Sequence, residues 1–79
     1  MPKKTDGETM HERILHSALE IFSNKGYSAA TIKDISNRAG CNTVTIFRHF
    51  EDKKAVMSKS VDMMVELILL QVREPAIGQ

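Results

Sequence analysis

Apolar side chains recur every three to four residues over much of the chain, which is the spacing of an amphipathic α-helix. The first such stripe covers residues 14–22. Thr9 and Glu12 precede it in the order of a capping box, in which two side chains and two backbone N–H groups satisfy one another. Gly26 is typical of a helix end. The pattern predicts a helix over about residues 10–25.

Two shorter helical segments follow, with only a few residues between them. A second capping box at residues 31–34 begins one segment, and Gly40 ends it. Asn42 can cap the next segment, in which Ile46 and Phe50 form an apolar pair one turn apart. This spacing is typical of a helix-turn-helix, whose second helix enters the major groove of DNA.

Asp52 is predicted to cap a fourth helix that runs through Val56 and Met64 toward Arg73, until Glu74–Pro75 stops it. Its apolar stripe widens until Glu66 is the one polar residue in the segment 63–70. A helix that is apolar on every side needs cover on every side, and three short helices cannot supply it. The segment is also too short to span a bilayer, which takes about 20 apolar residues. We expect a further domain or a partner to cover it, the alternative being an over-apolar last turn that frays.

Composition sets the fold class and excludes several kinds of protein. The 79 residues suffice for one small domain, and a single cysteine excludes an internal disulfide and a multi-thiolate zinc site. No strand pattern is visible. We therefore predict an all-α fold, a three-helix bundle containing a helix-turn-helix, plus the start of a long fourth helix. The first ten residues are polar and do not form a signal peptide, so a cytoplasmic protein is expected.

Charge is unevenly distributed although the net charge is only +1. Residues 25–54 contain six basic and three acidic side chains, which gives that segment +3 and the remainder −2. The chain can therefore present a local basic face.

Enzyme and metal chemistry find little support in the sequence. His11, Glu12 and His16 resemble the HExxH zinc motif, but the second histidine comes five residues after the first, and Leu15 stands where a ligand is needed. The serines and histidines lack an acidic partner and an oxyanion loop. We expect neither a metal site nor a catalytic function.

The second helix of the predicted motif can present short polar side chains near its start and cationic ones near its end. Short side chains let a helix lie close to base edges, and threonine or valine methyl groups can contact thymine methyl groups. Ser36 is small where the two helices approach, and Cys41 is expected to be a small buried apolar residue. The side chains expected to point outward are Thr43, Val44, Thr45, Phe47, Arg48 and His49.

The chain from about Glu12 to Val61 resembles the N-terminal DNA-binding domain of TetR-family transcriptional regulators. The resemblance rests on the turn at residues 39–42 and on the aromatic-x-His-Phe-x-x-Lys run at residues 47–53. It implies three DNA-binding helices, followed by a larger helical domain that binds an inducer and dimerises. The implied organisation is a helix-turn-helix domain at 10–54 and a helix at 55–79 that leads to a sensor and dimerisation domain missing from this chain. Residues 1–9 contain proline, glycine and charges without apolar periodicity, so a flexible arm is expected before these helices.

The resemblance also implies roles for individual residues. The residues at the family's phosphate-contacting positions are Thr31, Thr45, Phe47, His49 and Lys53. Those at its base-contacting positions are Lys33, Thr43 and Val44. Two residues depart from the pattern, because Phe47 replaces a common tyrosine and lacks its hydroxyl, and Val44 is bulkier than the glycine or small residue often found there. Val44 either contacts a thymine methyl group or displaces the helix slightly.

Several of these residues also have simpler interpretations. Lys53 can be a solvated lysine, His49 a packed histidine and Arg48 a solvated charge, whereas Lys33 can bind either phosphate or guanine. The lysines at 3–4 can enter a minor groove or remain in a solvated tail.

The expected function is sequence-specific binding of double-stranded DNA by a ligand-responsive regulator. By resemblance it is a repressor that binds a palindromic operator as a homodimer, with its small-molecule inducer in the missing domain and no cofactor here. Activation of transcription would use the same residues. The alternative is a helical protein–protein interaction module without DNA affinity. Neither implies contact with a membrane, and the resemblance implies a cytoplasmic protein associated with the bacterial nucleoid.

Overall fold

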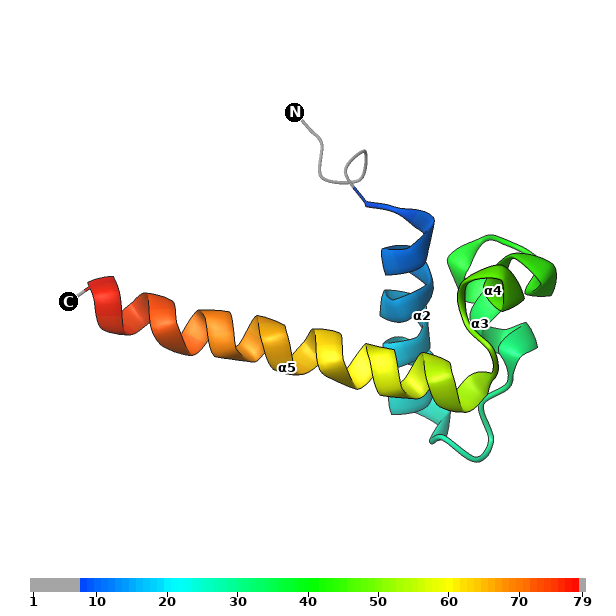
Figure 1. The fold of residues 1–79 in the computed structure, drawn as a ribbon. Helices are drawn as coiled ribbons and strands as arrows, with labels where there is room; N and C mark the ends of the chain where they lie inside the picture. The colour runs from blue at the N-terminus through cyan, green and yellow to red at the C-terminus, as the bar shows by residue number, and fades with distance from the viewer. Residues whose placement is uncertain (1–7, 79) are drawn as a thin grey trace.

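The computed structural model describes residues 8–78, which form four helices and no strand (Figure 1). Helix α2 packs against both α3 and α5, and α3 packs against α4. The expected all-α fold is confirmed. Residues 1–7 of the expected arm, with its two lysines, lie outside the described residues. The helices are α2 (Met10–Lys25), α3 (Ile32–Ala39), α4 (Thr43–His49) and α5 (Lys53–Gly78).

Side-chain caps begin the helices where the sequence predicts them. In α2, the Glu12 N–H donates to Thr9 Oγ1 at 3.1 Å, and the Thr9 N–H donates to the Glu12 carboxylate at 3.2 Å. In α3, the same two bonds join Thr31 and Asp34 at 3.0 and 3.1 Å. The Asp52 carboxylate accepts from the first turn of α5. Each cap satisfies N–H groups that have no partner within the helix.

Two of the helices end at glycines with positive φ. Gly40 has φ 76° and ψ 33°, in the left-handed region, and Gly26 has φ 86° with an extended ψ of 157°. The predicted end of the last helix at Glu74–Pro75 is wrong, because α5 continues to Gly78. A proline removes one backbone donor and disfavours helix in the residue before it, and here that preference does not break the helix.

One cluster of apolar side chains joins all four helices. Helix α2 supplies four of its members, while α5 supplies only Val56. The predicted apolar stripe of the last helix is therefore only partly covered, because Met63 packs against this cluster whereas Val61 and Met64 are 36% and 41% exposed. The buried apolar residues are Ile14, Leu15, Ala18, Phe22, Ala30, Ile35, Ala39, Ile46, Phe50 and Val56.

Two buried serines lie on α2 and α5, which pack against each other. Ser17 belongs to α2 and Ser60 to α5, and Ser60 is fully buried. Its hydroxyl donates to the Val56 carbonyl at 2.6 Å, so burial leaves no polar atom without a partner there. Small side chains at such positions let two helices approach closely. The apolar pattern alone does not reveal either serine.

The second half of α5 extends away from the other helices (Figure 1). Seven of its large apolar side chains between Val61 and Leu70 are exposed, as expected for a segment that three short helices cannot cover. No helix in the described part of the chain has the length and apolar character needed to cross a membrane. We call this surface the apolar face of α5, and its residues are Val61, Met64, Val65, Leu67, Ile68, Leu69 and Leu70.

Candidate nucleic-acid interface

A tight turn fixes α4 against α3. The left-handed backbone of Gly40 lets the N–H groups of Gly40 and Cys41 both donate to the Ser36 carbonyl, at 2.9 and 3.0 Å. Asn42 then caps α4, because its side-chain oxygen accepts from the Thr45 N–H at 2.9 Å. The two helices are thus joined by three residues, as the helix-turn-helix spacing predicts.

Small side chains fill the space under this turn. Ser36 is buried, and its hydroxyl donates to the Lys33 carbonyl at 2.8 Å, which leaves room for the neighbouring helix. Cys41 differs from the expectation, because it is half-buried and packs at the margin of the core. Its neighbour Asn42, which caps α4, is exposed, so the turn lies near the surface.

Helix α4 packs against the core through one side, and most of its remaining surface is exposed. Ile46 is its only buried residue. Val44 and Phe47 are 56% and 53% exposed, and Arg48 and His49 are also exposed. The expected outward face is therefore present at these four residues. It carries a cationic end, and α4 itself contains no acidic residue.

The two threonines of α4 are less exposed than expected. Thr43 and Thr45 are both half-buried. The Thr45 hydroxyl donates to the Asn42 side-chain oxygen at 3.1 Å, so its proton is already used within the cap. Thr45 must turn away from Asn42 before it can donate to a phosphate.

Thr31 caps the start of α3. Its hydroxyl oxygen accepts from the Asp34 N–H, and the same hydroxyl also acts as a hydrogen-bond donor toward the Asp34 carboxylate, whose pKa is lowered by hydrogen bonds from Lys25 and then from Thr31. The Asp34 carboxylate nearby also accepts from Lys25 Nζ at 2.9 Å. The lysine offsets a charge that would otherwise repel a phosphate. Lys33, in the first turn of α3, is exposed.

His49 lies next to His11, a residue whose sequence context suggested only a metal ligand. The Nδ1 atoms of His11 and His49 lie 3.4 Å apart, and the His11 ring stacks on Phe50 with centroids 4.8 Å apart. A hydrogen bond between two Nδ1 atoms requires one ring to donate and the other to accept, which leaves both Nε2 atoms outside it. His11 is thus a neighbour of the candidate interface contributed by α2, and no local sequence pattern reveals it.

Lys53 has partners that neither interpretation of the sequence foresaw. Its ammonium donates to the backbone carbonyls of Tyr27 and Ala30 at 2.7 and 2.9 Å. It also lies 4.3 Å from the centroid of the Tyr27 ring, within the range of a cation–π contact. The structure therefore brings Lys53 next to the loop that ends at Thr31, and links two of the predicted phosphate-contacting positions.

The eight predicted residues are distributed over one exposed helix and the starts of two others. Thr43, Val44, Thr45, Phe47 and His49 share α4. The remaining three stand at the first turns of α3 and α5. Among residues 8–78, no group of three or more histidine, cysteine, aspartate or glutamate side chains is placed to hold a metal ion.

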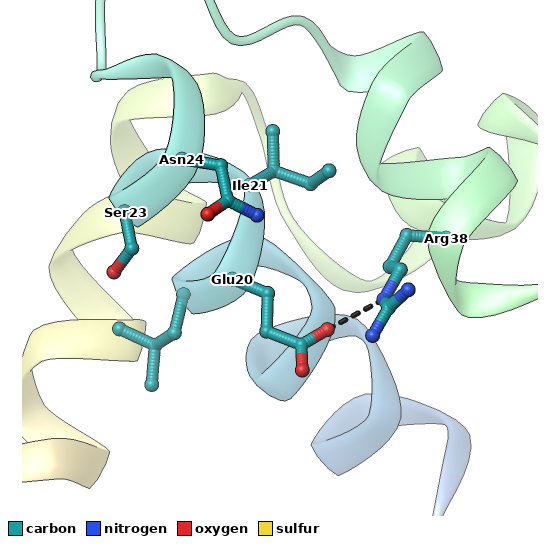
Figure 2. A pocket seen from close by; sticks show the side chains of 6 residues that line it. Glu20, Ile21, Ser23, Asn24 and Arg38 are labelled. Atoms are coloured by element: carbon teal, nitrogen blue, oxygen red, sulfur yellow. Dashed lines mark hydrogen bonds and ion pairs between the residues drawn. The ribbon is translucent and has the colours of Figure 1, made fainter.

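An open hollow of about 390 Å³ lies apart from these residues, between α2 and α3 (Figure 2). Glu20 and Arg38 form an ion pair across it, and the carboxylate raises the pKa of the Arg38 guanidinium above its ordinary value. Both side chains are more than half exposed, so the pair is well solvated. The hollow is lined by Leu19, Glu20, Ile21, Ser23, Asn24 and Arg38.

Comparison with known proteins gives consistent matches to one family. The family model described as bacterial regulatory proteins, tetR family, matches residues 14–59. The HTH-type transcriptional regulator YvdT of Bacillus subtilis is 34% identical over 73 residues, which are 92% of this chain and 37% of YvdT. The HTH-type transcriptional regulator UidR of Escherichia coli is 32% identical over 75 residues, 95% of this chain and 38% of UidR.

A third relative is the HTH-type negative transcriptional regulator IcaR of the icaADBC biofilm operon in Staphylococcus epidermidis. It is 32% identical over 53 residues, 67% of this chain and 29% of IcaR. The chain thus spans less than two fifths of the length of each of these relatives. The matched region contains the whole helix-turn-helix and the start of α5. The chain belongs to the TetR family of bacterial regulatory proteins.

Proposed function

We propose that residues 10–54 are the DNA-binding head of a transcriptional regulator and that α4 enters the major groove. The observation that carries this proposal is the exposure of α4. Ile46 anchors one side, while Val44 and Phe47 are more than half exposed beside two cationic or ionisable side chains. A short helix with this surface can approach the edges of base pairs. The names of the relatives favour the same function over a helical interaction module.

Phosphate contacts would fix the register of the head on DNA. Thr31 can donate its hydroxyl proton to a phosphate after that proton turns away from the Asp34 carboxylate, and Lys53 has one ammonium N–H beyond the two that its carbonyl partners accept. His49 can donate through Nε2 when that nitrogen carries the proton. Thr45 can donate to a phosphate after its hydroxyl turns away from Asn42. Phe47 can contact the DNA backbone through its ring but cannot form a hydrogen bond with it.

Base contacts would come from the other three residues. Val44, the most exposed apolar residue of α4, can pack against a thymine methyl group, and Thr43 adjoins it. Lys33 can donate to guanine from the first turn of α3. Lys33→Ala should then change the preference at one base pair, whereas an equal loss on every sequence would make Lys33 a phosphate contact.

The whole regulator would be longer than this chain. A helical domain after α5 would cover the apolar face of α5, bind a small-molecule inducer and form a homodimer. Two heads would then read an inverted repeat, and repression is the expected outcome, as the name of IcaR states for that protein. Its place would be the cytoplasm, on the nucleoid.

The first test is a salt series of binding to a randomised DNA duplex pool, followed by sequencing of the bound fraction. An enriched half-site, with an affinity that falls by a log–log slope of about −0.9 per neutralised phosphate, is expected. Lys59→Ala removes an equal charge from an exposed position on α5 and serves as the control for Lys33→Ala. Flat salt dependence without enrichment, in folded protein, would favour the interaction module. Steep dependence without enrichment would mean that specificity needs the dimer.

A further inference from the structure

The ammonium of Lys53 is held by neutral groups alone. Its two carbonyl partners belong to Tyr27 and Ala30, and the third neighbour is the face of the Tyr27 ring. The ion pairs between described side chains involve Arg13, Lys25 and Arg38, and not Lys53. The charge of Lys53 is therefore oriented by dipoles and a ring but is not neutralised.

The carbonyls that bind Lys53 belong to the loop between α2 and α3. This loop is a single turn, closed by the Ala30 N–H, which donates to the Gly26 carbonyl at 3.1 Å. The Ala30 side chain is buried, and the Tyr27 ring packs on Phe22 with centroids 5.5 Å apart. The next residue is Thr31, the cap of α3. A group that fixes the Ala30 carbonyl thus fixes the residue directly before that cap.

We propose that Lys53 is a positioning residue that links the first turn of α5 to the α2–α3 loop and so sets the start of α3 against the DNA backbone. An ammonium has three donors, of which the two carbonyls take two, and the third can reach a phosphate. Lys53 thereby serves the head in two ways, by its charge and by holding Thr31 in place. The DNA part of this inference rests on the proposed function, whereas the link to the loop does not.

The link can be tested without DNA, because Tyr27 is the sole tyrosine and the chain has no tryptophan. Intrinsic fluorescence therefore reports on the ring beneath Lys53. Lys53→Met should change the Tyr27 emission and speed amide hydrogen exchange at Ala30 and Thr31. The matched control is Lys54→Met, which removes an equal charge from an exposed position next to it. Unchanged emission and exchange in Lys53→Met would overturn the inference.

Two further variants separate loss of the link from loss of the fold. Far-UV circular dichroism measures the helix content of each variant. If Lys53→Met loses helix content, Lys53→Gln is the second neutral variant, with the same expectation. Lys53→Arg keeps a charged donor that can reach two carbonyls, and it should restore the Tyr27 emission at least in part. If both neutral variants fold and neither changes the Tyr27 emission, the link is contradicted.

A double-mutant cycle separates positioning from charge. Lys53→Met should weaken DNA binding more than Lys54→Met does. Its fold-loss should shrink at least about threefold in a Thr31→Ala background, because the contact that it positions is already gone. Equal fold-losses in both backgrounds would mean that Lys53 acts by its own charge alone. If the unaltered chain binds no DNA, the proposed function fails, and the Tyr27 measurements still decide the link.

Discussion

Asp34 connects two helices at the edge of the candidate interface. Its carboxylate accepts from Lys25 at the end of α2 and from the backbone N–H of Thr31 at the start of α3. The hydrogen bond from Lys25, followed by those from Thr31, lowers the pKa of Asp34 below its ordinary value of 3.8. The carboxylate is thus favoured in the folded state.

This lowered pKa predicts a specific acid sensitivity. The stability that Asp34 contributes is fully present above pH 3.8 and is lost as the pH falls through the lower pKa of the folded state. Asp34→Asn should destabilise the protein at neutral pH and flatten the loss of stability in acid, as followed by urea unfolding at several pH values. Asp62→Asn, at an exposed position of α5, is the control. Parallel acid profiles for Asp34→Asn and the unaltered protein would contradict this.

Phe47 allows a direct test of the phosphate-contacting positions. It is 53% exposed, so Phe47→Tyr adds a hydroxyl in solvent and should leave the free energy of unfolding unchanged. If the ring edge lies on a phosphate, the new hydrogen bond should tighten DNA binding by about 1 kcal/mol, close to fivefold. Fluorescence anisotropy with a labelled half-site measures this, and an unchanged affinity would place Phe47 away from the backbone.

At the scale of elements, the crossing of α2 and α5 depends on a small residue. Ser60 is fully buried, so Ser60→Leu inserts a large side chain into a packed contact and should cost about 1–3 kcal/mol of stability. Ser58→Leu makes the same chemical change at an exposed position of α5 and should be close to neutral. Thermal unfolding of both variants gives the comparison. Because leucine forms helix better than serine, helix propensity cannot explain a loss, and an equal effect of the two substitutions would mean that Ser60 does not lie in a packed contact.

Short sequence patterns predicted where the helices start. The same patterns could not predict contacts between residues that are far apart in the sequence. Thr9, Thr31 and Asn42 lie within three residues of the N–H groups that they cap, so sequence spacing is sufficient to predict them. The hydrogen bond from Lys53 to the Tyr27 carbonyl spans 26 positions, and it depends on how α5 packs against the rest of the fold. The predicted end of α5 at Glu74–Pro75 was wrong for another reason, because a proline weakens a helix without always ending it.

The candidate site shows the same division. The residues of α4 follow from one helix of known period, so the exposure of Val44 and Phe47 could be predicted. The neighbours of these residues could not, because His11 reaches His49 across 38 positions of sequence. Sequence therefore indicated which side chains to consider, and tertiary structure determined which of their donors are already in use.

At the scale of the whole molecule, the apolar face of α5 predicts association. Large exposed apolar patches favour contact with another surface, so the 79-residue chain should self-associate as its concentration rises. A double variant, Ile68→Glu with Leu69→Glu, should keep it monomeric in sedimentation velocity. Ser58→Glu adds a charge at an exposed position of the same helix and should leave the association intact. A chain that stays monomeric at every concentration would show that this face makes no such contact.

The length of α5 also gives the molecule a mechanical property. A straight helix of 26 residues is about 39 Å long, so a tilt of about 5° at one end displaces the other by roughly 3 Å. Lys53 is its first residue and is bonded to the loop before α3. A sideways displacement of the far end that left the helix straight would therefore tilt its first turn and move the ammonium that holds the loop.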